Sequence, residues 1–243
     1  MTSDLPASER NAILRDGIAV GVATGAYSLS FGAISVASGL DVWQTCVLSL
    51  LVFTGASQFA LIGVIGAGGA PLSGAATALL LGTRNTLYGL RLAPQLGYRG
   101  WRRLAAAQLV IDESTAMAIT RETRSAARTG FLGTGLAVFT LWNLGTLLGA
   151  VAGDALGDPR TFGLDAAVGA AFLALLWPRL RDPRNRLVAA LSVAVALGLT
   201  PVTAVGVAVL AAGGVALLVG VASRRPDPTE FPLHDDHPGG GHR

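Results

Sequence analysis

The sequence consists largely of long apolar segments separated by short polar stretches. About eight segments can be distinguished, and most are close to the roughly 20 residues that a helix needs to cross a bilayer. They cover residues 17–39, 43–66, 72–92, 104–119, 130–152, 163–178, 187–201 and 203–222. Only 14% of the residues are charged, against about 25% in ordinary soluble domains, so lipid is the expected solvent. The pattern predicts an all-α, multi-pass membrane bundle of about seven to eight segments, some of them re-entrant or broken.

The chain divides into three regions by composition. Residues 1–16 are expected to form a cytoplasmic N-terminus, and residues 17–222 a transmembrane transporter domain. Residues 223–243 are rich in proline, glycine and charge, which predicts a disordered polar tail. All three histidines lie in this tail, where no preformed metal geometry is expected, so neither a metal nor another cofactor is predicted.

Arginines, which account for all 18 basic residues, predict the orientation in the membrane. If all eight segments cross, four arginine clusters lie on one side, which the positive-inside rule makes cytoplasmic. They are Arg10 and Arg15; Arg121, Arg124 and Arg128; Arg179, Arg181, Arg184 and Arg186; and Arg224 and Arg225. The remaining cluster, from Arg91 to Arg103, would then lie outside. Eight crossings are favoured, but if segments 17–39 and 104–119 were both re-entrant, every cluster would be cytoplasmic.

Glycines recur at every fourth position in two segments, first at Gly17, Gly21 and Gly25 and then at Gly145, Gly149 and Gly153. This spacing places each set on one helix face, where two backbones can approach closely. Tight packing within the bundle is the favoured interpretation. Docking of a second subunit on one of these stripes is the alternative.

Polar residues inside three apolar segments are the candidates for function, because each ionisable group there costs roughly 2.5–3.5 kcal/mol on insertion scales. In the second segment, Thr54 and Gln58 share a helix face beside the small residues Gly55, Ala56 and Ser57. An amide in this setting can bind a ligand or a neighbouring helix, and both roles remain open.

In the third segment, Arg84 and Tyr88 share a face and Arg91 continues it one turn further. A planar guanidinium is suited to bidentate binding of a carboxylate. That carboxylate could belong to a substrate, or it could be Asp112 or Glu113. Snorkelling of Arg84 toward a nearby surface is the alternative without a functional role.

Asp112 and Glu113 are adjacent in the short fourth segment and are followed by Ser114 and Thr115. Adjacent side chains on a helix point about 100° apart, so the two acids meet different neighbours. They are candidates for proton exchange inside the membrane, and solvated residues at a helix end are the alternative. Trp142 and Asn143, beside the second glycine stripe, form a weaker fourth site.

Other function classes find little support in the sequence. The arginines form no stripe along a polar helix, so nucleic acid is not an expected partner. No histidine lies in an apolar segment, and the single cysteine, Cys46, has no partner for catalysis or metal binding, so an enzyme is not expected. A membrane scaffold or a channel subunit without uphill transport remains the alternative to a transporter.

The polar motifs and their order resemble those of the AzlC-type branched-chain amino acid permease family, the large subunits of branched-chain amino acid exporters. The resemblance covers nearly the whole chain apart from the tail. It runs through Ser30-Phe31-Gly32, Phe53-Thr54-Gly55-Ala56-Ser57-Gln58-Phe59, Arg84-Asn85-Thr86-Leu87-Tyr88-Gly89 and Asp112-Glu113-Ser114. It implies export of leucine, isoleucine, valine and sometimes methionine across the cell membrane, driven by the proton-motive force. It also implies a small hydrophobic membrane subunit of the AzlD type as partner.

With this resemblance, the expected site has two parts. The substrate-binding part comprises Gln58, Ser57, Gly32, Arg84, Asn85 and Tyr88, and the proton-coupling part comprises Asp112 and Glu113. The chain departs from the family pattern directly after the arginine, where many members have histidine and this chain has Asn85. Because an amide cannot titrate, the acids are the expected proton carriers. Asp112 is favoured, since Gln108 and Thr115 fall on its face.

Overall fold

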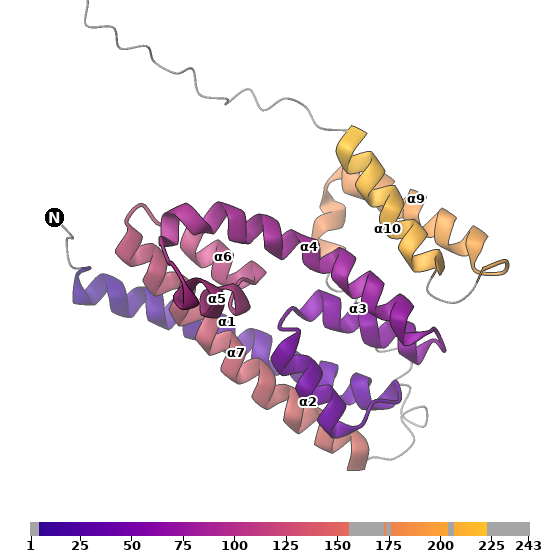
Figure 1. Ribbon diagram of the computed structural model, residues 1–243, viewed down its shortest axis with the longest axis horizontal. Coiled ribbons are helices and arrows are strands. Elements are labelled where there is room, and N and C mark those ends of the chain that lie inside the picture. Colours follow the sequence, from indigo (N-terminus) through magenta and orange to yellow (C-terminus); the bar gives the residue numbers. More distant parts are fainter. Residues whose placement is uncertain (1–4, 156–172, 174–175, 204–206, 223–243) are drawn as a thin grey trace, which may run out of the picture.

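The computed structural model describes residues 5–155, 173, 176–203 and 207–222, and every element of regular structure among them is a helix (Figure 1). The helices are α1 (Ala7–Ala37), α2 (Val42–Leu51), α3 (Gly55–Gly66), α4 (Pro71–Leu96), α5 (Trp101–Gln108), α6 (Asp112–Ile119), α7 (Arg124–Ala155), η2 (Trp177–Arg181), α9 (Pro183–Leu199) and α10 (Val207–Ala222). The predicted all-α membrane bundle is confirmed. The predicted tail and most of segment 163–178 lie outside the described residues.

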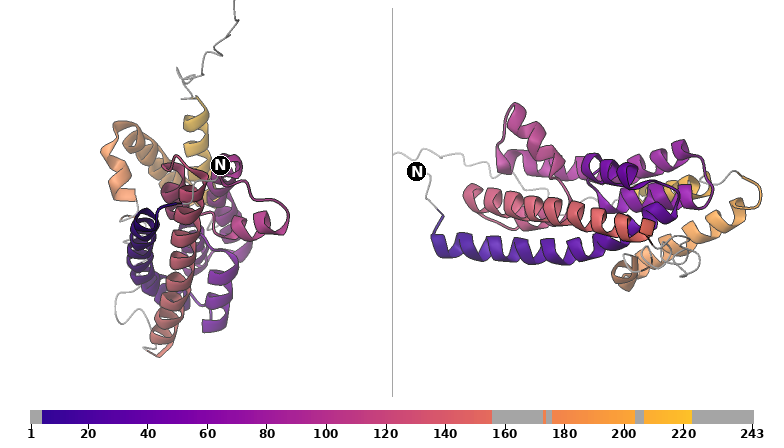
Figure 2. Two further views of the ribbon diagram at one scale, coloured as in Figure 1. Left: turned by 90° about the vertical axis from the view of Figure 1, so that its left-hand side faces the viewer. Right: turned by 90° about the horizontal axis from the view of Figure 1, so that it is seen from below.

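Two long helices, α1 and α7, run side by side along the bundle (Figures 1 and 2). They are parallel, because Gly17 near the start of α1 faces Thr134, whereas Ala33 near its end faces Gly153. Among the described helices these two are long and apolar enough to cross a membrane on length and composition alone. Helix α1 begins at Ala7, ten residues before the predicted segment.

Both glycine stripes lie in the contact between these two helices. A methyl group added at Gly149 would overlap the carbonyl oxygen of Leu29, and one added at Gly21 would lie 2.9 Å from the Cβ atom of Ala137. Because each stripe packs against the other long helix, neither is free for a second subunit. The glycines therefore serve tight packing within the bundle, as the favoured interpretation predicted, and the alternative of a second subunit docked on a stripe is wrong.

This packing predicts a large effect for Gly149→Ala. The added Cβ would meet backbone atoms of α1, and overpacking of this kind typically costs about 1–3 kcal/mol. We expect a lower midpoint of thermal unfolding in detergent. The control is Gly198→Ala in α9, where an added Cβ has no atom within 4 Å and the midpoint should not fall. Equal midpoints for Gly149→Ala and the wild type would contradict the close contact.

The predicted segment 43–66 is not one helix but two, α2 and α3, which are separated by residues 52–54. Asp41 caps the start of α2, directly after the end of α1. The last residue of α3, Gly66, packs against Ser38, which is also at the end of α1. The chain therefore enters the bundle along α2, turns at residues 52–54 and returns along α3 to the same end.

The predicted segment 104–119 is divided in the same way, into α5 and α6, but this pair enters from the opposite end. The side chain of Gln95, at the end of α4, donates to the carbonyl oxygens of Ala118 and Arg121, both at 3.0 Å. The two turns meet inside the bundle, where Gln108 Nε2 donates to the carbonyl oxygen of Leu50 at 2.9 Å. Two helix pairs thus reach the interior from opposite ends.

This arrangement changes the expected position of the arginine cluster from Arg91 to Arg103. Helix α4 runs opposite to α7, since Arg128 near the start of α7 donates to the carbonyl oxygen of Leu96 at the end of α4, at 2.8 Å. The cluster from Arg91 to Arg103 therefore lies at the same end as Arg15 and the start of α7. The structure therefore does not consist of eight straight crossings. Segment 104–119 is re-entrant, as in the alternative prediction. Segment 17–39 is continuous, however, and the second re-entrant segment is 43–66.

The C-terminal helices α9 and α10 pack on each other beside α4 (Figure 1). Ser192 of α9 donates a hydrogen bond to the carbonyl oxygen of Ala212 at 3.1 Å. Gly213 of α10 faces Leu80 of α4, where an added Cβ would lie 3.0 Å from the leucine side chain.

Candidate functional site

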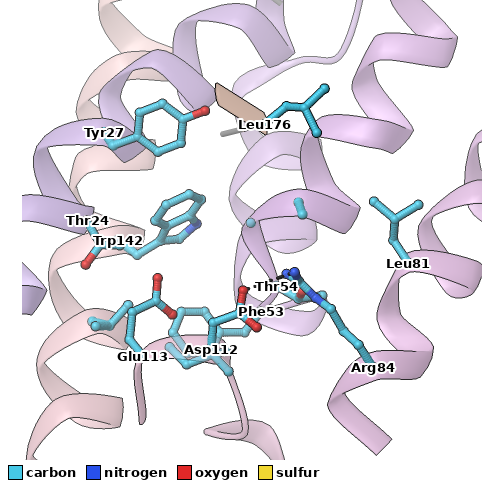
Figure 3. Close-up of a pocket in the computed structure, with 14 residues that line it drawn as sticks. Thr24, Tyr27, Phe53, Thr54, Leu81, Arg84, Asp112, Glu113, Trp142 and Leu176 are labelled. Atoms are coloured by element: carbon cyan, nitrogen blue, oxygen red, sulfur yellow. Dashed lines mark ion pairs between the residues drawn. The ribbon is translucent and has the colours of Figure 1, made fainter. Parts of the chain in front are cut away.

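A cavity of about 410 Å³ lies where the two helix breaks meet (Figure 3). Ligand pockets typically measure about 300–1,000 Å³, so it is large enough for a small molecule. Five helices, the two turns at residues 52–54 and 109–111, and residue 176 contribute to its lining. The lining residues are Thr24, Tyr27, Phe53, Thr54, Gly55, Ala56, Leu81, Arg84, Ile111, Asp112, Glu113, Val138, Trp142 and Leu176.

The N-termini of two short helices open on this cavity. Helix α3 begins at Gly55 and α6 begins at Asp112, and both residues line the cavity. The first backbone N–H groups of a helix have no partner within it, and they carry a partial positive charge. The side chain of Thr54 makes no capping hydrogen bond to α3, so the first amides of that helix are without a side-chain cap. The start of α6 has its own acids, Asp112 and Glu113, in the first turn.

Arg84 and Asp112 form an ion pair across the cavity, with 3.0 Å between the Arg84 NH1 nitrogen and the Asp112 Oδ2 oxygen (Figure 3). The sequence left open which carboxylate faces this arginine, and the structure assigns Asp112. The pair is incomplete: Arg84 Nε and Asp112 Oδ1 are buried and have no hydrogen-bond partner among the described residues. Each partner therefore has one polar atom that makes no hydrogen bond to the described residues.

Aromatic side chains form the opposite wall of the cavity (Figure 3). The Tyr27 ring lies 5.2 Å from Phe59, and the Trp142 ring lies 6.1 Å from Phe31, measured between ring centroids. The Tyr27 hydroxyl group is buried and has no hydrogen-bond partner among the described residues. The cavity thus presents charge on one side and apolar surface on the other.

Gln58 lies behind this wall rather than in it. It is fully buried, accepts a hydrogen bond from Trp142 Nε1 at 3.1 Å, and donates to the carbonyl oxygen of Leu48 at 3.5 Å. The second bond reaches a carbonyl near the end of α2 that also accepts from the backbone N–H of Val52, at 2.9 Å. Gln58 therefore bridges the break between α2 and α3 and orients Trp142 toward the cavity.

Ser114 bridges the other break. Its hydroxyl group donates to the carbonyl oxygen of Leu109 and accepts from the backbone N–H of Ile111, so that it spans the turn between α5 and α6. In both helix pairs, α2–α3 and α5–α6, a polar side chain of the second helix donates a hydrogen bond to a carbonyl oxygen near the end of the first helix. Inside a membrane the bonds of Ser114 are important, because water cannot satisfy the backbone groups that a break leaves unpaired.

The other residues of the predicted substrate site lie in different places. Ser57 is 1% exposed, and its hydroxyl group faces Gly82 without a hydrogen-bond partner in the described residues. Gly32 lies in the contact between α1 and α7, away from the cavity. Tyr88 is half-buried on α4, and Asn85 lines a second cavity.

This second cavity, of about 490 Å³, lies toward the arginine-rich end of the bundle. Its lining includes Arg103, Gln108 and the last three turns of α4. Phe53 and Thr54 line both cavities, so the turn between α2 and α3 separates one from the other. The Phe53 ring packs edge-on against Phe139, with 5.0 Å between their centroids.

Sequence reasoning missed several cavity residues, chiefly Thr24, Tyr27, Phe53, Leu81 and Val138. Aromatic and aliphatic side chains in an apolar segment look the same whether they line a cavity, pack in a core or face lipid. Of these residues, Tyr27 could have been identified from the sequence, since a phenol in the middle of a membrane segment needs a polar partner. Within the described ranges, no group of His, Cys, Asp and Glu side chains is arranged to hold a metal ion.

Comparison with known proteins identifies relatives of the chain. The sequence model of one family, described as AzlC protein, matches residues 19–156. An uncharacterized membrane protein of Archaeoglobus fulgidus is 32% identical over 77% of this chain and 84% of its own length. The inner membrane protein YgaZ of Escherichia coli is 27% identical over 76% of this chain and 78% of its own length. No solved structure matches the chain.

Proposed function

Because the chain belongs to the AzlC protein family, a family of membrane proteins with a transport-related role, we propose that it exports branched-chain amino acids across the cell membrane. The proposed substrates are leucine, isoleucine and valine, with methionine as a further candidate. One observation carries the proposal: a single cavity inside the bundle joins an incomplete ion pair to an aromatic wall. A free amino acid with an apolar side chain has the matching chemistry.

In the proposed binding mode, the substrate inserts between Arg84 and the acids of α6. Its carboxylate binds the guanidinium of Arg84 and the free backbone amides at the start of α3, both of which suit an anion. Its ammonium group binds Asp112 or Glu113. The side chain then lies against Phe53, Val138 and Trp142, and Gln58 contributes by holding Trp142 in place.

We propose that the same acids couple export to protons. A protonated carboxyl group cannot hold an ammonium group as an ion pair, so a proton and a substrate compete for Asp112. Substrate would leave outward as a proton takes its place, and the proton would be released inward when the next substrate binds. This competition gives exchange of substrate for protons. The second cavity is the proposed route from the cytoplasm, with Phe53 and Thr54 as the barrier.

The proposed assembly includes a small hydrophobic membrane subunit of the AzlD type. Because both glycine stripes are occupied within this chain, the subunit would bind another lipid-facing surface. Transport rather than catalysis remains the proposed role.

Competition binding tests the proposed substrate class. An apolar pocket separates ligands by only roughly 1–3 kcal/mol per methylene, so leucine, isoleucine and valine should displace labelled leucine within about a hundredfold of one another. Free lysine and glutamate should not displace it, since the wall formed by Phe53, Val138 and Trp142 cannot pair a charged side chain. The measurement is made on the purified chain in detergent. Selective binding of a charged amino acid would refute the proposal.

A further inference from the structure

An open apolar groove of about 560 Å³ runs along the outer surface between α5 and α7. Its lining includes Trp101, Ala105, Leu109, Leu132, Leu136 and Phe139. The groove is open to the surroundings of the protein, because Trp101 is 72% exposed and Leu136 is 53% exposed. In a membrane protein, a surface of this kind faces lipid chains.

The groove begins at a strongly basic loop. Arg99, Arg102 and Arg103 are all exposed, and none forms an ion pair with another residue that the structure describes. The sequence contains no acidic residue from Val42 to Ile111, so none nearby in the chain compensates them. Arg102 also lines the groove and lies over the Trp101 ring, 5.9 Å from its centroid. Exposed tryptophan is typical of the headgroup level of a bilayer.

The other side of α5 faces the second cavity. Tyr98, Ala106 and Gln108 line both the groove and that cavity, so α5 is a thin partition between them. The inner end of α5 is joined to α2 through Gln108, which donates to the carbonyl oxygens of Leu50 and Leu51. Whatever fills the groove therefore supports the helix that lines the cavity.

From these observations we propose that the groove binds an anionic phospholipid, with an acyl chain between α5 and α7 and its phosphate group on Arg102 and Arg99. Basic surfaces at the cytoplasmic end of membrane helices attract anionic headgroups, whereas a zwitterionic lipid offers the same chain without the net charge. The bound lipid holds α5 against the second cavity. This site is independent of the proposed transport function, and its test requires no substrate.

Thermal unfolding of the delipidated chain in detergent tests the proposal, because a ligand that binds the native state raises the unfolding midpoint. Phosphatidylglycerol should raise the midpoint more than phosphatidylcholine with the same acyl chains. The double variant Arg99→Gln/Arg102→Gln should lose this difference but keep the response to phosphatidylcholine. Leu136→Trp, which fills the groove, should reduce the response to both lipids.

The matched control is Arg10→Gln, which removes an exposed arginine from α1 at the same end of the bundle. It should retain the full preference for phosphatidylglycerol. Equal responses of the wild type to the two lipids would overturn the proposal. So would an equal loss of preference in Arg10→Gln, which would indicate attraction to surface charge in general. If Leu136→Trp kept its lipid responses but lost a co-purifying membrane subunit, the groove would be a protein interface instead.

Discussion

Arg84→Lys is expected to weaken leucine binding by roughly 10- to 150-fold, although it preserves the positive charge. A hydrogen bond to a charged group contributes about 1.5–3 kcal/mol, and 1.4 kcal/mol corresponds to tenfold in affinity. Arg84 pairs with Asp112 at 3.0 Å and retains a buried Nε without a partner among the described residues. Lysine has no planar fork, so it cannot bind the substrate carboxylate in the bidentate way that this geometry allows. Titration of the purified protein with leucine measures the change.

The matched control for this prediction is Arg91→Lys. Arg91 lies two turns further along α4, is exposed, and lines neither of the two cavities described above. The same substitution there should leave the affinity for leucine unchanged. Wild-type affinity in Arg84→Lys, or an equal loss in Arg91→Lys, would reject direct contact between Arg84 and the substrate.

Asp112→Asn is expected to abolish leucine accumulation driven by a proton gradient. The amide can neither carry a proton nor pair with an ammonium group, so the competition on which coupling depends is lost. Glu113→Gln should weaken leucine binding but preserve accumulation driven by the proton gradient if Asp112 is the carrier.

Glu122→Gln is the control for the two acidic variants. Glu122 is an exposed acid between α6 and α7 and does not line the cavity, so its loss should alter neither binding nor accumulation. The midpoint of thermal unfolding in detergent, which depends on neither substrate binding nor a proton gradient, checks that each variant is folded. If Asp112→Asn and Glu113→Gln both accumulate leucine at the wild-type rate, neither acid carries the proton.

The polar part of the cavity could be anticipated from the sequence because charge inside a membrane is costly. Arg84, Asp112 and Glu113 stand out against long apolar stretches, and the structure places all three around one cavity. The shortness of segment 104–119, together with its acids, also indicated a break. These inferences depend on the chemistry of single residues, which needs no knowledge of long-range packing.

The remaining features depend on packing that the sequence does not reveal. Segment 43–66 reads as one long helix, because the residues at its break, Val52, Phe53 and Thr54, include no proline or glycine. What stabilises this break is Gln58, whose partners Leu48 and Trp142 lie 10 and 84 residues away in the sequence. The parallel arrangement of α1 and α7 likewise becomes evident only from the residues that each glycine faces on the other helix.

The most direct test of the proposed function is accumulation of labelled leucine in vesicles that contain the purified chain together with the proposed small membrane subunit. The vesicles have an acidic interior, so that protons leave as leucine enters. The proposal predicts that the internal leucine concentration rises above the external one, and that a protonophore abolishes this excess. Leucine that only equilibrates across the membrane would indicate a channel. No entry beyond that of protein-free vesicles would indicate a scaffold, and either result would contradict a proton-coupled exporter.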